Sequence, residues 1–415
     1  MNKKFLNILI IGSLTLAFQA CGDDDPVVSP STEYSTSDYE FPSRFGDGSS
    51  VAYTGQVVRN VLIKDLKELA SGNTATAAEF TDLFTNNGGN GSTAPILNPE
   101  EQTAWSDFGG NTSRLQNKIA TDPLLGWNIT PTAAMELWFS QVSSSTLADE
   151  TRYVNADYLE LNQMIGKGLL GVVAYYQGTS VYLPKMEDDY TTNGECDLND
   201  DGSCPGYSSM EHHWDESFGY FGASRTYNTS TDDNARKSSS DIDGNGTIDY
   251  MTEYNFDWAT YAAKRDIACA TAGCTSDADF TGDIMGAYIE GRTLIHNEGA
   301  LDDITAQRLI IQNSWEKLVA ANVIHYANDV ASKIESGSGI LHSWAEMRAF
   351  SMALQYNSAK LISDSVLSDV ITLMGVTPPA EADYTTYQTT LTGTDGVVSK
   401  LQEAYMFEDT NVNNW

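Results

Sequence analysis

Basic residues are scarce in this sequence. It carries 23 lysines and arginines against 57 aspartates and glutamates, which gives a formal net charge of -34 at pH 7. Loss of residues 1–20 would remove Lys3 and Lys4 and no acid, so the remaining chain would carry -34 - 2 = -36. A surface this acidic repels the phosphate backbone of nucleic acids and excludes them as partners. It suits cation binding, or simply solubility outside the cell.

Several catalytic signatures are also missing. The sequence has no GxSxG elbow, no HExxH motif and no CxxC pair. Their absence argues against an α/β-hydrolase, a zincin, a zinc ribbon and a thioredoxin-type centre. No complete catalytic constellation emerges from the five histidines and five cysteines. We therefore expect a protein without enzymatic activity.

Long hydrophobic runs are rare, and the clearest one covers residues 5–18. It is too short for a membrane span and has the wrong flanks for one, with Lys3 and Lys4 before it and Cys21 shortly after it. This pattern predicts a lipoprotein signal peptide over residues 1–20 and a lipid on Cys21. The acidic residues 22–25 resemble the export signal of Bacteroidetes surface lipoproteins, which implies an outer-membrane protein anchored by its lipid and exposed at the cell surface. The alternative is a secreted protein with an ordinary cleavage site.

Cysteine usage agrees with export. Apart from Cys21, four cysteines remain, an even number that suits disulfides in an oxidising compartment. Three pairings are possible, and we favour the two local ones, Cys196 with Cys204 and Cys269 with Cys274.

Two acidic loops favour calcium. In the second acidic loop (residues 241–249), the side chains at positions 1, 3, 5 and 9 of an EF-hand pattern are Asp241, Asp243, Asn245 and Asp249. Position 12 is Thr252 instead of glutamate, and Glu253 comes one residue late. The first acidic loop (residues 197–202) fits less completely, through Asp197, Asn199 and Asp201. The alternative is that both loops are plain turns, because Asn, Asp and Gly favour turn conformations.

A histidine-rich segment, residues 211–222, lies between these loops. On a helix, His213 and Glu216 share one face, and His212 shares a face with Asp215 and with Glu216. Imidazole and carboxylate groups together suit zinc, iron or copper. Further ligands would have to come from elsewhere in the chain. The alternative is that His212 and His213 are ordinary hydrogen-bonded residues beside a buried aromatic stripe.

Apolar periodicity predicts a mainly α protein. Short strands are expected at residues 33–41 and 49–54, as a small N-terminal hairpin. Three glycines at 166, 168 and 171 lie within an apolar helical face, which predicts close approach to a neighbouring helix. The expected helices cover residues 56–72, 99–108, 133–143, 155–176, 211–222, 251–271, 283–296, 302–335, 340–373 and 397–406.

Three segments carry a family resemblance: residues 39–42 (Tyr-Glu-Phe-Pro), residues 166–171 (Gly-Lys-Gly-Leu-Leu-Gly) and the His-Trp-Asp-Glu run at 213–216. With them the chain resembles an uncharacterised Bacteroidetes lipoprotein family, domain of unknown function 4856. The last segment is also similar to the GxHxxE segment of imelysin-like proteins, with Glu211 where that segment has glycine. That similarity implies two helical bundles and a link to metal uptake or to a peptidase activity.

These observations give one expected organisation and function. The predicted parts are a signal peptide (1–20), a flexible tether (21–37), a first imelysin-like helical half (38–190), an acidic insertion (191–255) and a second helical half (256–415). We expect a surface-anchored lipoprotein that binds a metal ion, a metal complex or a partner without catalysis. The alternatives are an imelysin-like metallopeptidase and a structural or adhesive surface protein stabilised by calcium.

Overall fold

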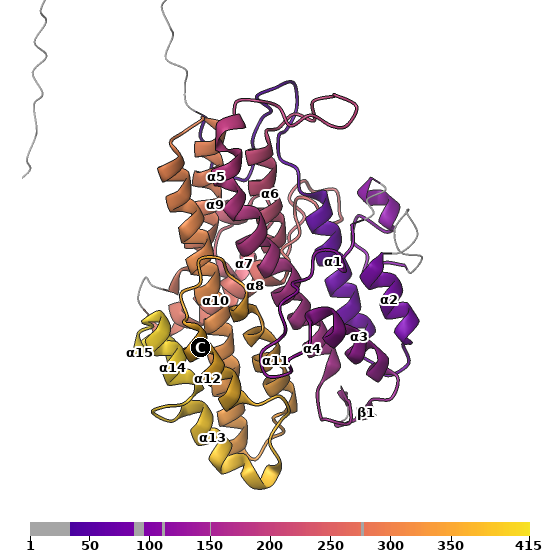
Figure 1. The fold of residues 1–415 in the computed structure, drawn as a ribbon, viewed down its shortest axis with the longest axis vertical. Helices are drawn as coiled ribbons and strands as arrows, with labels where there is room; N and C mark the ends of the chain where they lie inside the picture. Colours follow the sequence, from indigo (N-terminus) through magenta and orange to yellow (C-terminus); the bar gives the residue numbers. More distant parts are fainter. Residues whose placement is uncertain (1–33, 87–94, 110–112, 150, 275–277) are drawn as a thin grey trace, which may run out of the picture. The chain divides into compact units, whose positions relative to one another are not determined.

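The computed structural model describes residues 34–86, 95–109, 113–149, 151–274 and 278–415. The predicted signal peptide, Cys21 and most of the tether lie outside these residues. Within them the chain is mainly α-helical, as expected (Figure 1). No helix in these ranges is both long enough and apolar enough to cross a membrane.

Most of the longer helices overlap predicted ones. The longer helices are α1 (Thr54–Leu69), α2 (Ala77–Thr85), α3 (Pro131–Val142), α4 (Leu161–Leu169), α6 (Ser209–Phe221), α8 (Asp257–Ala272), α9 (Phe280–His296), α10 (Leu301–Ser336), α11 (Leu341–Ser351), α12 (Asp364–Met374), α13 (Tyr384–Thr392) and α14 (Val397–Tyr405). Helices α2 and α13 were not predicted, and the expected helix 340–373 is divided into α11 and α12. Three single-turn helices accompany them: α5 (Met186–Asp189), α7 (Asp233–Arg236) and α15 (Asp409–Val412). Short 3-10 turns lie at η1 (Trp105–Phe108), η4 (Leu183–Lys185), η5 (Tyr190–Thr192), η6 (Tyr227–Thr229), η8 (Ala353–Gln355) and η9 (Glu381–Asp383).

Strand structure is confined to one small hairpin in the described residues. Strands β1 (Thr146–Leu147) and β2 (Tyr153–Val154) pair antiparallel, with Thr146 opposite Val154. The expected N-terminal hairpin is reduced to a single antiparallel bridge between Pro42 and Ser49. The residues before that bridge pack against α6 and α9 instead of forming a longer strand, as described below.

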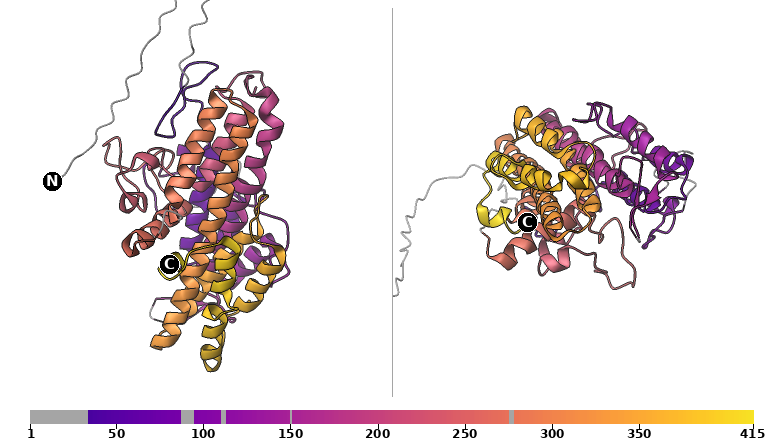
Figure 2. Two further views of the ribbon diagram at one scale, coloured as in Figure 1. Left: turned by 90° about the vertical axis from the view of Figure 1, so that its left-hand side faces the viewer. Right: turned by 90° about the horizontal axis from the view of Figure 1, so that it is seen from below.

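Residues 34–415 cluster as one unit around helix α10. Helix α10 packs against α9 and α11, α11 packs against α4, and α1 packs against both α4 and α6 (Figure 2). Helices from before and after the acidic insertion therefore share one hydrophobic core. Four tryptophans are fully buried in it: Trp214, Trp258, Trp315 and Trp344.

The glycine-rich helical run lies further along the chain than the predicted residues 155–176 and is less regular. Helix α4 begins only at Leu161, and it continues as two π-helical stretches, η2 (Leu170–Tyr175) and η3 (Gln177–Tyr182). The predicted close approach is confirmed. A Cβ on Gly166 would lie 2.7 Å from the Lys67 side chain of α1, and one on Gly171 would lie 3.0 Å from the Ala353 backbone nitrogen.

Two other predicted helices differ from the structure. Within each predicted range, a side chain binds backbone amides in a non-helical stretch. The expected helix 340–373 is interrupted after Ser351, and between α11 and α12 the buried Glu316 carboxylate accepts hydrogen bonds from the amides of Leu361 and Ile362 at 3.0 and 3.1 Å. The expected helix 99–108 is reduced to its last turn, where Asp107 caps the chain at Ala104.

Candidate metal centre

The second acidic loop is closed by its own backbone around Asp241. The two carboxylate oxygens of Asp241 accept hydrogen bonds from the amides of Gly244 at 2.7 Å and Gly246 at 2.8 Å. Both glycines have positive φ angles, +76° and +92°, which glycine adopts without steric cost. These amides, with Gly246 the first contributor, lower the pKa of Asp241. The loop thus holds Asp241 ionised at its centre.

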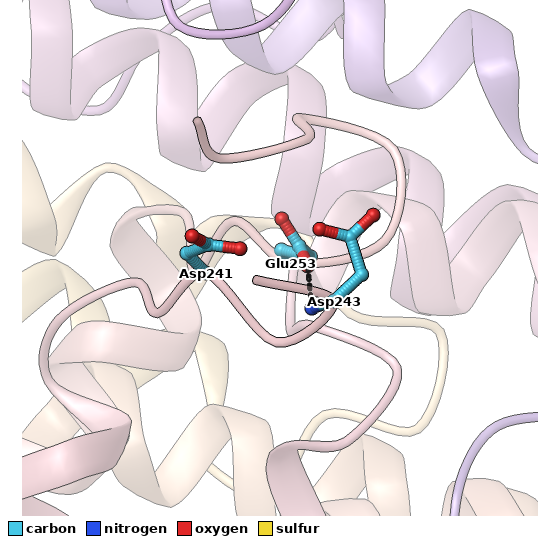
Figure 3. A group of neighbouring side chains, drawn as sticks. All are labelled: Asp241, Asp243 and Glu253. Atoms are coloured by element: carbon cyan, nitrogen blue, oxygen red, sulfur yellow. Dashed lines mark hydrogen bonds between the residues drawn. The ribbon is translucent and has the colours of Figure 1, made fainter. Parts of the chain in front are cut away.

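Glu253 completes this loop, although it comes four residues after it. One oxygen of its buried carboxylate accepts from the amides of Ile242 (2.8 Å) and Asp243 (3.1 Å), and the other accepts from the amide of Asp249 (2.9 Å). One carboxylate oxygen each from Asp241, Asp243 and Glu253 lie within 4.8 Å of one another (Figure 3). The glutamate one position late in the sequence is therefore the third carboxylate of the group.

The other predicted calcium ligands take different positions. The Asn245 side-chain oxygen accepts from the Thr247 amide at 2.8 Å, and its amide nitrogen donates to Glu101 at 3.0 Å. Asp249 is directed to the turn that leaves the loop, where it accepts from the Met251 amide at 2.7 Å. The sequence pattern did not point to Glu101, because it lies far away in the chain.

The first acidic loop is built differently. A disulfide joins Cys196 to Cys204, with Cα atoms 5.9 Å apart, as predicted. Asp201 accepts from the amide of Ser203 at 2.9 Å, and the Asn199 amide donates to the Ser203 carbonyl at 2.9 Å. Among the residues that the structure describes, Asp197, Asn199 and Asp201 belong to no cluster of three metal-binding groups.

The second predicted disulfide is absent from the structure. Cys269 and Cys274 are free thiols, with Cys269 buried. Helix α8 ends between them at Gly273, and the Cys274 amide donates to the Cys269 carbonyl at 3.0 Å. The Cys274 thiol donates to the Thr410 carbonyl at 3.4 Å. The two thiols lie close enough to interact, but no S–S bond joins them.

Both ring nitrogens of His213 have protein partners. Nδ1 lies 2.6 Å from the Asp189 carboxylate, and Nε2 lies 2.9 Å from the Lys185 ammonium. The neighbouring His212 stacks on Tyr207, with ring centroids 4.6 Å apart, and its Nδ1 lies 3.1 Å from the Ala52 carbonyl. The lysine occupies the side of His213 that a metal ion would need.

The two predicted carboxylate ligands of α6 lie in different surroundings. Asp215 is fully buried and accepts from Tyr39 (2.7 Å), from the Ala52 amide (3.1 Å) and from Arg292 (2.9 Å). Glu216 accepts from the side-chain amide of Gln56 at 2.7 Å. His212, His213, Asp215 and Glu216 are therefore neighbours on one helix, and each has its own partners. Among the described residues they form no three-residue metal-binding group.

Comparison with known proteins identifies the family. The model of the family described as "Domain of unknown function (DUF4856)" matches residues 36–371. The chain belongs to this DUF4856 family. No curated protein and no solved structure matches it. The similarity to imelysin-like proteins stays a prediction.

In this DUF4856 chain, two of the segments that carry the family resemblance meet in space. The Tyr39 ring stacks on Phe218 of α6, with centroids 3.7 Å apart, and its hydroxyl donates to Asp215. The remaining segment, residues 166–171, lies on α4 and η2 and packs against other parts of the chain. Residues 39–42 and 213–216 therefore join the N-terminal segment to α6.

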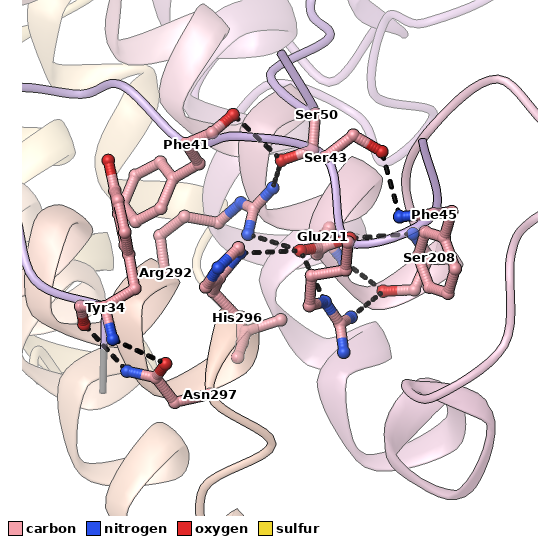
Figure 4. Close-up of polar contacts among 12 residues, drawn as sticks. Tyr34, Phe41, Ser43, Phe45, Ser50, Ser208, Glu211, Arg292, His296 and Asn297 are labelled. Carbon is pink, nitrogen blue, oxygen red and sulfur yellow. Dashed lines mark hydrogen bonds and ion pairs between the residues drawn. The ribbon is translucent and has the colours of Figure 1, made fainter. Parts of the chain in front are cut away.

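A buried charge network surrounds the start of α6 (Figure 4). Glu211 forms a capping box with Ser208, and its carboxylate also accepts from Arg292 at 2.8 Å and Arg44 at 3.1 Å. His296 Nδ1 lies 3.6 Å from the same carboxylate. Burial alone would raise the pKa of Glu211, but His296, Arg292 and Arg44 lower it to about 2. Arg292 also donates to Ser50, so the network joins three distant parts of the DUF4856 chain.

Sequence reasoning did not find this network. Glu211 was noted only as a departure from the imelysin-like segment, and Arg292 lies 81 residues away from it. The one available signal was a Ser-x-x-Glu capping pattern at Ser208 and Glu211. It predicts the start of a helix but not the arginines that bind its glutamate.

Proposed function

We propose that this DUF4856 protein is a non-catalytic binding protein, anchored by a lipid to the outer membrane, whose second acidic loop binds calcium. The observation that carries the calcium site is the group formed by Asp241, Asp243 and Glu253. Calcium takes six to eight oxygen ligands at about 2.3–2.6 Å, so two oxygens on opposite sides of the ion lie about 4.8 Å apart. The spacing of these three carboxylates, within 4.8 Å, fits that requirement.

The charge of the group supports the same proposal. In the described part of the chain, the hydrogen-bond partners of these three carboxylates are backbone amides and the side-chain amide of Asn245. Three carboxylates this close repel one another, and no lysine or arginine of the described residues forms an ion pair with them. A divalent cation would remove that repulsion, and oxygen ligands select a hard ion such as calcium over zinc or iron.

The contacts of α6 support a binding role over a peptidase. A metallopeptidase needs ligands with a free nitrogen or oxygen and an open position for an activated water. His213 is bound at both nitrogens, and Asp215 is buried beneath Arg292. We therefore assign these residues to holding the N-terminal segment and α5 against α6.

Isothermal titration with calcium, after the purified full chain has been treated with a chelator, tests the metal site. We expect one calcium per chain in the wild type and at least tenfold weaker binding for Asp243→Asn. Asp201→Asn is the matched control. Asp201 lies in the first acidic loop and, like Asp243, accepts a hydrogen bond from the backbone amide of the residue two positions later. Equal calcium binding by the two variants would place the ion elsewhere, and no binding by the wild type would refute the site.

Elemental analysis of the same protein tests the alternative metal. Zinc, iron or copper near one per chain, and lost in His213→Ala, would overturn the non-catalytic calcium proposal in favour of the α6 site. For the anchor, Cys21→Ser should move the protein out of the membrane fraction. Retention of that variant in membranes would contradict lipid attachment at Cys21.

A further inference from the structure

We infer that a pocket between α1 and the start of α8 binds a sugar-sized polyol that carries one phosphate or carboxylate group. The pocket has a volume of about 350 Å³, within the range of small-molecule sites. Its walls come from α1, from the residues after α7 and from the first turn of α8. None of these residues belongs to the calcium group.

Positive charge gathers in this pocket although the chain as a whole carries -34. Three lysines line it: Lys64 and Lys67 from α1, and Lys237 from the opposite wall. Among the described residues, no ion pair or hydrogen bond occupies the ammonium group of Lys67 or of Lys237. An anionic ligand can therefore bind both groups without displacing a protein carboxylate.

Lys64 and Lys67 are held in place by their surroundings. The Lys64 ammonium donates to the Asn98 carbonyl at 3.0 Å and to the Tyr250 hydroxyl at 2.8 Å. Both acceptors are neutral, and the nearby carboxylates of Asp65, Glu68, Glu100 and Asp257 act on the ammonium only electrostatically. The stem of Lys67 packs against Gly166 of α4, where a Cβ would lie 2.7 Å from it. The glycine thus makes room for the stem of Lys67, which is one of the residues that line the pocket.

The other residues that line the pocket indicate which groups the rest of the ligand carries. Tyr254 offers an aromatic face, and the hydroxyls of Ser71, Ser238 and Ser239 offer donors and acceptors. Glu68 and Asp257 also line the pocket, and their carboxylates can accept hydrogen bonds from hydroxyl groups of a ligand. Lysine is suited to phosphate as a point charge, and the pocket contains no arginine fork. A compact anion joined to several hydroxyl groups satisfies all of these side chains.

The two ends of the second acidic loop meet at this pocket. Lys237 and Ser239 precede the loop, and Tyr254 follows Glu253 directly. The ends are joined by Asn255, whose amide donates to Ser239 at 3.0 Å and whose side chain donates to the Ser238 carbonyl at 2.9 Å. Calcium in the loop would therefore fix both walls and increase the affinity for the anion. Only this linkage rests on the proposed function.

The test is calorimetric titration of the full chain with glucose 6-phosphate, glucuronate, glucose and inorganic phosphate. We expect glucose 6-phosphate or glucuronate to bind at least tenfold more tightly than glucose and than inorganic phosphate. The better of the two charged sugars identifies the anion as phosphate or carboxylate. Equal binding of glucose would refute the role of the lysines, and equal binding of inorganic phosphate would refute the polyol part. Absence of binding by all four would overturn the inference.

Two variants locate the site. Lys67→Gln and Lys237→Gln should each weaken binding at least tenfold, and Lys237 is exposed, so its replacement leaves the fold intact. Lys360→Gln is the control, since Lys360 pairs with the exposed Asp364 away from the pocket. Unchanged affinity in the first two variants would contradict the site. Titrations with the anion in calcium and in chelator separate the two proposals. If the anion binds equally well in both, the linkage to the calcium loop is refuted and the pocket is not.

Discussion

Two groups of acidic side chains in this protein differ in how their charge is balanced. Glu211 and Asp215 are fully buried and bind Arg292, which is buried as well. Asp241 and Asp243 are exposed, and among the described residues their carboxylates and that of Glu253 accept hydrogen bonds from amide groups and form no ion pair with a lysine or arginine. The first group contains its own cation, so it contributes to the fold. Within the described residues the second group has no such partner, and it is the group that we propose binds a cation from solution.

Removing the internal cation should have the largest effect. Arg292→Met would leave the carboxylate of Asp215 buried without a charged partner, and we expect the free energy of unfolding to fall by about 3–5 kcal/mol. Denaturant unfolding measures this loss. Arg308→Met is the matched control, because Arg308 binds the exposed Glu187, and a surface pair contributes about 0–1 kcal/mol. Similar losses in the two variants would show that the buried pairing is not stabilising.

Acid should weaken the buried group next. The pKa of Glu211 is lowered to about 2, so its contribution is complete above the unfolded-state pKa of about 4.3. It is lost as the pH falls from there towards 2, because protonation then favours the unfolded chain. The expected loss is about 3 kcal/mol. Unfolding free energies between pH 2 and 7 test this, and Glu211→Gln should flatten that part of the profile. Parallel profiles would contradict the assignment.

Calcium should stabilise the folded protein through the second group only, and by less than the two effects above. At a free calcium concentration 100 times its Kd, binding stabilises the folded state by about 2.7 kcal/mol. Addition of a chelator should remove that stabilisation in the wild type and in Asp201→Asn, but have little to remove in Asp243→Asn. Thermal unfolding with and without chelator measures the difference. If the chelator destabilised Asp243→Asn as much as the wild type, calcium would not be bound by this carboxylate group.

Local patterns allowed a large part of the fold to be predicted. The apolar stripe of α10 gave residues 302–335, and the helix covers Leu301–Ser336. The interruptions were not predictable in the same way. Between α11 and α12 the chain is held by Glu316, which binds amides 45 and 46 residues away, and no local pattern records that contact.

The candidate sites follow the same division. Asp241 and Asp243 were found because calcium loops have a fixed spacing, and Glu253 was noted as one residue late. Glu101 and Arg292 were missed because their contacts join residues 144 and 81 positions apart. The α6 histidines showed the opposite error: helical spacing put them on shared faces, but it could not show that Lys185 already lies beside His213.

The contacts of the N-terminal segment also constrain the order in which the chain can fold. Tyr34 exchanges hydrogen bonds with Asn297, Tyr39 donates to Asp215, and Arg44 donates to Glu211 and Glu298, across separations of 167 to 263 residues. During synthesis this segment emerges before its partners, which lie on α6 and at the end of α9. Contacts this distant in sequence form slowly. Tyr39 can therefore dock only once α6 has been made, and Tyr34 only once the end of α9 has been made, so this stretch stays without its native contacts for much of synthesis.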